Sequence, residues 1–385
     1  MNNRKTLMPK LFKPNHIKII LITVFSTILF WSVFSFNIPS LLGLPSVSLK
    51  TLFSNYDGPN YLVIAKCGYN FDCIRNTFSL GLPLEYYPAH LPGYPLTIKL
   101  LDIIFPGPVA MLISTLAGSV FLNLFFYKFL RLFTKEKQAF FLTTVFNFLP
   151  ARLFVLRNVA APETWFIGFI IASLYYFKNK KYLVSAIFLS LAQVFKTPAV
   201  LLLASYLLYF LHLLKNSKKP ILIIKSFLPF VLVPLSVLLV FLVYYFQTGD
   251  FWAYFNSGDN RHIFPIPFGV FVGNSSWVNG IWLEDIVFIF ILAYYAGLKL
   301  FKKYKLIPIG TFVLLYTIAT TFVVHRDISR YITPIYPLVF LVFRKHLYNQ
   351  TFKKVFYIII VAVYLYSINF CLGNTAPVAD WTPYL

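Results

Sequence analysis

The feature that most constrains this chain is the recurrence of uncharged apolar runs, many approaching 20 residues, along the whole sequence. A helix needs about 20 apolar residues to cross the hydrocarbon layer of a bilayer, which is roughly 30 Å thick. With 59% hydrophobic and 12% charged residues among 385, the chain has too few polar side chains to cover a single soluble core. The sequence therefore predicts an all-α, polytopic transmembrane bundle.

We expect about 11 spans in one membrane domain over residues 1–385, without a soluble domain. The spans are expected near residues 19–36, 107–130, 138–153, 161–177, 182–195, 198–214, 222–245, 279–299, 306–324, 331–344 and 353–371. The first run follows a basic segment and resembles a signal peptide, but residues 37–40 form a poor cleavage site, so we expect it to remain as an anchor. The count is open by one or two, because residues 92–105 fit either a partial span or a re-entrant helix.

Basic residues gather between the apolar runs, and this distribution predicts the orientation. Six clusters hold 24 of the 34 Lys and Arg residues, and we expect them in the cytoplasm, together with the N-terminus. The clusters lie at residues 4–18, 128–137, 178–181, 215–225, 299–305 and 344–354. Segments 37–91 and 246–278 and the last 14 residues are then expected outside. The net charge of +22 is explained by these loops, and we expect membrane lipids but no nucleic acid as partners.

Several predicted spans contain only 13 or 14 consecutive uncharged residues and have a charged residue at the outer end. These charged residues are Arg152, Glu163, Lys196, Asp285 and Arg330. A charge at mid-bilayer depth costs roughly 2.5 kcal/mol or more, so such side chains usually face a bundle interior or a wet cavity. We therefore expect a shared cleft, and any chemistry, on the outer face.

The first outer loop contains Asp57, followed by Gly58 and Pro59, a context typical of a helix start. Asp57 is either a base at the membrane surface or simply the N-cap of that helix. The spacing of the apolar residues after it suits a helix lying in the membrane interface. Cys67 and Cys73 are both expected outside, where they either pair or remain free thiols.

Several motifs together resemble the GT-C superfamily of polytopic glycosyltransferases, closest to the GPI mannosyltransferase II family and its bacterial relatives. The motifs are Asp57-Gly58-x-x-Tyr61-Leu62-x-Ile64-Ala65-x-x-Gly68-Tyr69, Tyr87-Pro88-x-x-Leu91-Pro92-x-Tyr94-Pro95-Leu96, Ala161-Pro162-Glu163-Thr164, Lys196-Thr197-Pro198 and His325-Arg326-x-x-x-Arg330-Tyr331-x-x-Pro334. The resemblance covers residues 19–345 and is strongest in the first loop. Residues Pro59-Asn60 depart from the family pattern, which has an aromatic or His there.

The resemblance implies transfer of a hexose, for example mannose, from a polyprenyl-phosphate donor to a hydroxyl acceptor on the outer face of a membrane, expected to be the cell membrane of a prokaryote. Asp57 would act as general base, with inversion at the sugar carbon. Departure of an anionic lipid phosphate calls for fixed positive charge, so Arg330, Arg326 and Lys196 are candidate phosphate ligands. Candidate substrate-binding residues are Tyr61, Tyr69, His90, Tyr94, Glu163 and His325.

Alternative interpretations of these residues remain open at this level. Glu163 either binds substrate hydroxyls or pairs with Arg152 or Arg157, and Arg326 and Arg330 could instead anchor the chain at the interface beside Asp327. Glu284 and Asp285 suit a structural role, and His262 is a weak groove candidate. We expect no cofactor and no metal ligand, because only one acidic residue stands in the Asp57 motif and the His residues lack ligand spacing.

Two other classes of protein compete with a glycosyltransferase. A flippase or transporter of lipid-linked saccharides would also need many spans, but such proteins often show repeated halves, and no repeat is visible. A polysaccharide polymerase or ligase would also be polytopic and Arg-dependent, yet would not explain the Asp57 motif.

Overall fold

The computed structural model describes residues 14–385 except 42, 44, 80, 259–261 and 273–282. The described part is helical, with two isolated β-bridges and no β-strand among those residues. Most of the N-terminal basic cluster, as well as Asp259 and parts of the expected 246–278 loop, lie outside the described residues.

Five helical segments of the described chain are long and apolar enough to cross a membrane. They are α1 (Pro14–Ser35), α7 (Pro108–Arg131), η2 with α12 (Thr197–Lys215), α13, η3 and α14 together (Pro220–Thr248), and α20 (Gln350–Gly373). Their outward faces carry exposed apolar side chains, such as Leu239 on α14 and Ile358 on α20. Such faces are expected where lipid is the solvent, so the chain has the character of a membrane protein.

Shorter helices lie between these five. They are α8 (Glu136–Phe146), α9 (Ala151–Leu156), α10 (Glu163–Lys178), α11 (Tyr182–Phe195), α16 (Leu283–Leu298), α17 (Ile307–Thr321), α18 (Ile328–Tyr331) and α19 (Tyr336–Phe343). The run predicted as one span at 138–153 is broken between α8 and α9, since Pro150 lacks an N–H and disfavours helical geometry in the residue before it.

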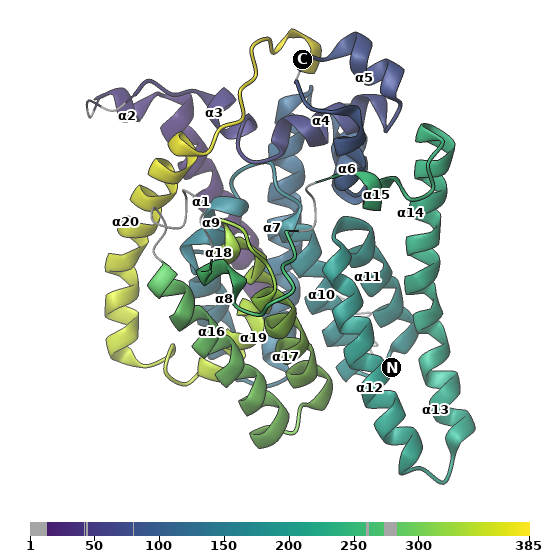
Figure 1. Cartoon of the computed structure of the whole chain (residues 1–385). Coiled ribbons are helices and arrows are strands. Elements are labelled where there is room, and N and C mark those ends of the chain that lie inside the picture. Colours follow the sequence, from purple (N-terminus) through teal and green to yellow (C-terminus); the bar gives the residue numbers. More distant parts are fainter. Residues whose placement is uncertain (1–13, 42, 44, 80, 259–261, 273–282) are drawn as a thin grey trace, which may run out of the picture.

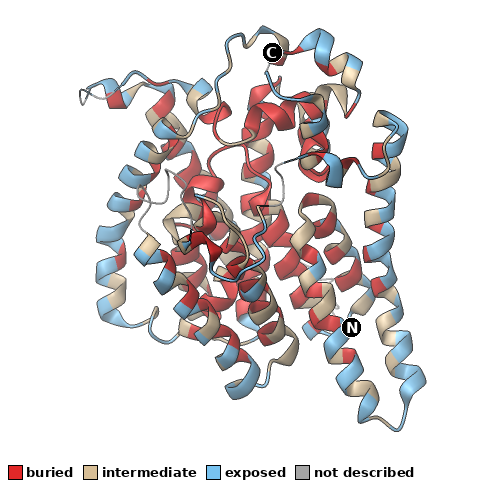
Figure 2. Ribbon diagram, in the orientation of Figure 1, coloured by how far each residue is buried: buried red, intermediate tan, exposed pale blue. Residues whose placement is uncertain are grey.

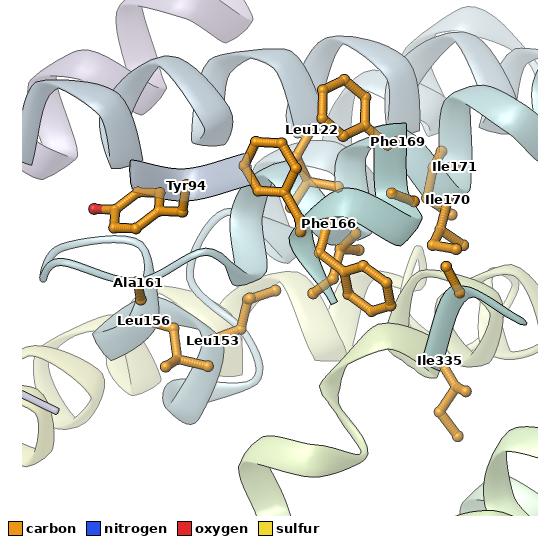
Figure 3. Packing of buried hydrophobic residues seen from close by; sticks show 14 of the residues in the cluster. Tyr94, Leu122, Leu153, Leu156, Ala161, Phe166, Phe169, Ile170, Ile171 and Ile335 are labelled. Carbon is orange, nitrogen blue, oxygen red and sulfur yellow. The ribbon is translucent and has the colours of Figure 1, made fainter. Parts of the chain in front are cut away.

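The interior is built around α7 and α10, which Figure 2 shows as largely buried. The two helices approach closely where each carries a glycine: a Cβ on Gly118 would lie 2.6 Å from Thr164 Oγ1, and one on Gly168 would lie 2.7 Å from Phe121 Cδ1. Small residues allow helices to pack closely in a membrane. Figure 3 shows Leu122 and Phe166 within the same apolar core.

Several short helices follow α1 and cover one end of the bundle (Figure 1). They are α2 (Ile38–Leu41), α3 (Leu49–Phe53), α4 (Gly58–Cys67), α5 (Phe71–Thr77), η1 (Leu84–Ala89) and α6 (Gly93–Asp102). Helix α4 does not lie on the surface as an amphipathic interfacial helix would, because it packs against α6 and α7 with residues 58–65 all buried. Helix α6 instead exposes Leu96 and Leu100, and it occupies the stretch expected as a partial span.

Candidate active site

Asp57 is positioned by a tight turn between α3 and α4. Tyr56 has a φ of 52°, and a Cβ on Gly58 would lie 2.3 Å from the Phe53 carbonyl oxygen, so only glycine fits at position 58. Asp57 occupies the N-cap position of α4, yet among the described residues its side chain makes no capping hydrogen bond. The carboxylate is thus not used to cap α4 and can interact with other side chains.

Asp57 faces a cavity of about 510 Å³ formed by segments that are far apart in the sequence. The walls come from the first loop, η1, the starts of α10 and η2, α15 (Ala253–Asn256), α17, α18 and the segment after α20. Eight of the candidate site residues line this cavity: Asp57, Tyr61, His90, Glu163, Lys196, His325, Arg326 and Arg330. The structure therefore assembles most of the predicted site in one place.

Two carboxylates and two cations meet in the cavity. Glu163 Oε1 accepts hydrogen bonds from Lys196 Nζ and Arg330 Nε, each at 2.6 Å, and its side chain is 1% exposed. Glu163 Oε2 is buried without a hydrogen-bond partner in the described structure. Arg330 Nη1 also lies 3.9 Å from Asp57 Oδ2. Arg330 is thus shared between the two carboxylates.

Asp57 is held in its ionised form by its surroundings. Burial by itself would raise the pKa of Asp57, but the neighbouring His90, Arg330 and Lys196 outweigh burial and hold that pKa well below its usual range. His90 Nε2 lies 3.7 Å from Asp57 Oδ1. The carboxylate is therefore ionised throughout the neutral pH range and can accept a hydrogen bond.

A second ion pair, between Arg152 and Asp327, lies on the other side of Tyr56 from Arg330. Arg152 Nη2 lies 3.2 Å from Asp327 Oδ1, and Arg152 Nη1 donates to the Tyr56 hydroxyl at 3.2 Å. The guanidinium of Arg330 lies over the Tyr56 ring, 4.3 Å from its centroid. Tyr56 therefore lies between the two ion pairs and contacts the arginine of each, one through its hydroxyl and the other through its ring.

The α17–α18 connection brings His325 and Arg326 to the cavity. His325 packs against His262 with ring centroids 4.5 Å apart, and its Nδ1 accepts a hydrogen bond from Asp327 N at 2.9 Å. Arg326 is exposed at the cavity wall. Its guanidinium is thus available to a ligand that enters from solvent.

Two predicted substrate-binding residues lie behind the cavity wall. Tyr94 is fully buried, and its hydroxyl bonds to Met111 O at 2.9 Å, while its ring packs edge-on against Tyr61. Tyr69 donates to His90 O at 2.7 Å and packs against Tyr244. Neither lines the described cavity, where their contribution is to hold Tyr61 and His90 in place, but Tyr69 lines the neighbouring apolar groove described below.

The structure also shows how the other charged residues pair. Glu163 pairs with Lys196 and Arg330, whereas Arg152 pairs with Asp327. Arg157 points away, donating to the carbonyls of Asn147 and Thr23 and to the hydroxyls of Ser26 and Thr27. Glu284 and Asp285 are exposed in the first turn of α16, where acidic side chains favour a helix.

Some cavity residues were not among the candidate site residues. They include Tyr56, Tyr254, Tyr316, Tyr331, Thr333 and residues 374–377. Of these, Tyr331 belongs to a recognised motif and Tyr56 adjoins one. The remaining positions come together only through the packing of distant segments.

Cys67 and Cys73 form a disulfide across the end of α4 and the start of α5. Of the two possibilities left open by the sequence, the structure therefore takes the paired one. The bond fastens the far end of the helix that begins after Asp57.

An apolar groove of about 390 Å³ lies beside the cavity. It is bounded by the end of α4, by α6 and by α14, and Lys99 and Gln247 are among its polar residues. The two spaces adjoin at consecutive residues, since Leu91 and Phe195 line the cavity while Pro92 and Val194 line the groove. The groove could take an apolar chain attached to a polar group in the cavity.

Comparison with protein-family models gives no match, and a search among curated proteins also gives none. Among the described residues, no group of three His, Cys, Asp or Glu side chains is arranged to hold a metal ion.

Proposed function

We propose that this protein is a GT-C-type membrane glycosyltransferase that moves a hexose from a polyprenyl-phosphate donor to a hydroxyl acceptor. The observation that carries the proposal is the meeting of an ionised, partly exposed carboxylate, Asp57, with Arg330 and Lys196 in one cavity. Glycosyl transfer from a lipid phosphate needs both a base for the acceptor and fixed positive charge for the leaving group.

The donor phosphate lies between Arg330, Lys196 and Arg326 in this mechanism. A phosphate competes with Asp57 and Glu163 for the Arg330 guanidinium, whose donor geometry suits bidentate phosphate contact. As Arg330 turns toward the phosphate, Asp57 loses part of the positive charge that lowers its pKa and becomes a stronger base. Donor binding thus prepares the carboxylate for the acceptor.

The reaction is a single displacement. The acceptor oxygen attacks the anomeric carbon, and its proton passes to Asp57. The bond between that carbon and the phosphate oxygen breaks, and the electron pair leaves with the polyprenyl phosphate. One displacement inverts the configuration of the sugar carbon. Arg330 and Lys196 stabilise the charge that develops on the leaving group.

The groove beside the cavity supports a lipid-linked donor. Its walls are mainly apolar and include Leu96 and Leu239, both exposed on the molecular surface. An isoprenoid chain in this groove would leave its phosphate near Lys196, which follows Val194 and Phe195 at the boundary between the two spaces.

The proposal includes a topology of about 11 crossings with the site on the outer face. Helices α3 to α6 and the end of the chain lie together at one end of the bundle, whereas the turn between α12 and α13 and the turn between α16 and α17 lie at the opposite end (Figure 1). Those two turns carry the basic clusters at 215–225 and 299–305, which are expected in the cytoplasm.

Purified protein in lipid vesicles, incubated with a panel of polyprenyl-phosphate hexoses and alkyl hexosides as acceptors, tests the proposal. We expect release of polyprenyl phosphate and formation of a disaccharide with at least one donor. A mock purification from cells that do not express the protein controls for contaminating enzymes. Movement of a labelled donor between leaflets, without release of lipid phosphate from any donor, would instead identify a flippase.

A further inference from the structure

The segment after α20 returns across the molecule to the turn that carries Asp57. Thr375 and Asn55 form an antiparallel β-bridge, and Ala376 N donates to Ser54 O at 2.7 Å. Asn55, which is fully buried, also donates from Nδ2 to Cys371 O at 3.0 Å. The residues just before Asp57 are thus bonded to a segment more than 300 positions later in the chain.

The far end of this segment is fastened as well. Trp381 packs against Phe53 with centroids 5.9 Å apart, and Tyr384, only 2% exposed, packs against Phe78 at 4.9 Å. Lys66 on α4 donates to the carbonyl of Pro383 at 3.1 Å. Residues 374–385 are therefore held against the first loop at both ends, as the yellow trace in Figure 1 shows.

Residues 374–377 of this segment line the cavity. The boundary with the apolar groove is formed elsewhere, by Leu91 and Phe195, where a Cβ on Gly93 would lie 2.4 Å from the Phe195 ring. The lipid part of a donor has a place at that boundary. Residues 374–377 are bonded to Ser54 and Asn55, which directly precede Tyr56 and Asp57, so this part of the wall is available to the other substrate.

We propose that residues 374–385 position the acceptor, forming the wall against which its reacting hydroxyl meets Asp57. This inference rests on the proposed function and adds which of the two substrates the segment contacts. The acceptor is a polyhydroxylated compound, because Asn374 and Thr375, whose side chains can form hydrogen bonds, line the same cavity as Asp57. The Asn374 amide also donates to Asn55 Oδ1 at 3.5 Å, two residues before Asp57.

The test separates acceptor from donor binding by steady-state kinetics. The donor and alkyl hexoside that give the fastest turnover in the panel above serve as substrates. Trp381→Ala and Tyr384→Ala remove the ring contacts that hold the far end of the segment. Thr375→Trp places a larger side chain on the cavity wall and leaves both of those rings unchanged. Asp72→Asn, at an exposed position of the first loop outside this segment, is the control. We expect the acceptor KM to rise at least fivefold in the first three variants, with the donor KM within twofold of wild type.

A cross-link tests the placement of the segment without any turnover. Ser54 and Ala376 stand opposite each other beside the Asn55–Thr375 bridge, so Ser54→Cys with Ala376→Cys should form a disulfide on mild oxidation. Peptide mass spectrometry of the full-length protein detects the link, and Ser54→Cys with Ala379→Cys is the control pair that should not form it.

The outcomes separate the two proposals. A cross-link together with a selective rise in acceptor KM supports the inference. An unchanged acceptor KM in Thr375→Trp, an equal rise in both KM values, or no cross-link overturns it while the proposed function stands. A wild-type protein that turns over no polyprenyl-phosphate hexose overturns the proposed function, and the acceptor role with it, even where the cross-link forms.

Discussion

The exchange of Asp57 for asparagine tests the proposed base most directly. An amide keeps the size of the side chain but cannot take the acceptor proton, and general-base assistance is typically worth about 10²- to 10⁴-fold. At roughly 1.4 kcal/mol per decade, the barrier should rise by about 3 to 5 kcal/mol. We therefore expect kcat of Asp57→Asn to fall by at least a hundredfold.

The structure predicts a much smaller effect of Asp57→Asn on folding. Asn caps helices nearly as well as Asp, and the carboxylate makes no capping bond in the described structure. The Arg330 contact, at 3.9 Å and with the Asp57 side chain 32% exposed, is screened by solvent, so its loss should cost about 1 kcal/mol of stability. Removal of the carboxylate also frees Arg330 for the phosphate, so the donor KM should stay unchanged or fall.

Initial rates of lipid-phosphate release against donor concentration, together with thermal unfolding in detergent, measure these effects. Asp72→Asn is the matched control, since Asp72 is an exposed carboxylate of the same loop, paired only loosely with Arg75 at 3.6 Å. Intact-protein mass spectrometry should confirm that the asparagine introduced before Gly58 has not deamidated. Wild-type kcat in Asp57→Asn would refute the base assignment, and a donor KM raised in step with lost stability would indicate a structural role.

Three further predictions follow from the contacts in the cavity. Arg330→Lys should reduce catalytic efficiency about tenfold at matched expression, because an ammonium cannot reproduce the bidentate contact. Equal efficiency would indicate an interfacial anchor, and an active Arg330→Ala would move the phosphate site to Arg326 or Lys196. Glu163→Gln should lower the thermal stability by about 3 kcal/mol, since it leaves the partly buried Arg330 and Lys196 without their shared buried carboxylate, and it should lower the donor KM. Unchanged values of both would contradict the shared ion pair. Burial, with the neighbouring His262, lowers the pKa of His325 to about 4, below the roughly 6.5 of an unfolded chain. His325 therefore contributes stability that is complete above pH 6.5 and declines as the pH falls toward 4. His325→Gln should show a smaller loss of melting temperature than wild type between pH 7 and pH 5, and identical slopes would refute this.

The apolar pattern predicted the position of most helices but not the ends of all of them. Runs without charge become helices because apolar side chains and internally bonded backbone suit lipid. The prediction of one continuous helix at 138–153 was wrong, because hydropathy does not detect the break that Pro150 imposes between α8 and α9. The burial of α4 was also not predictable, because it depends on α6 and α7 closing around it.

Sequence reasoning identified most charged residues of the candidate site but not how they pair. Glu163 was matched with Arg152 or Arg157 because these are close in the sequence. In the structure its partner Arg330 is 167 positions away, and the turn before α10 directs Arg157 toward α1. Proximity along a chain predicts contact only within one helix, where residues three or four apart share a face.

Tyr56 shows how distant parts of the chain hold the candidate site in place. Its left-handed backbone costs on the order of 1 to 3 kcal/mol, which persists only where surrounding contacts fix it. Those contacts come from distant parts of the chain: Arg152 bonds its hydroxyl, Arg330 covers its ring, and Phe370 of α20 packs beside it at 5.7 Å. Because Asp57 is the next residue, each of these contacts also fixes the carboxylate. Preorganised charged groups need little rearrangement as charge develops in a transition state. Electrostatic catalysis is most effective under this condition.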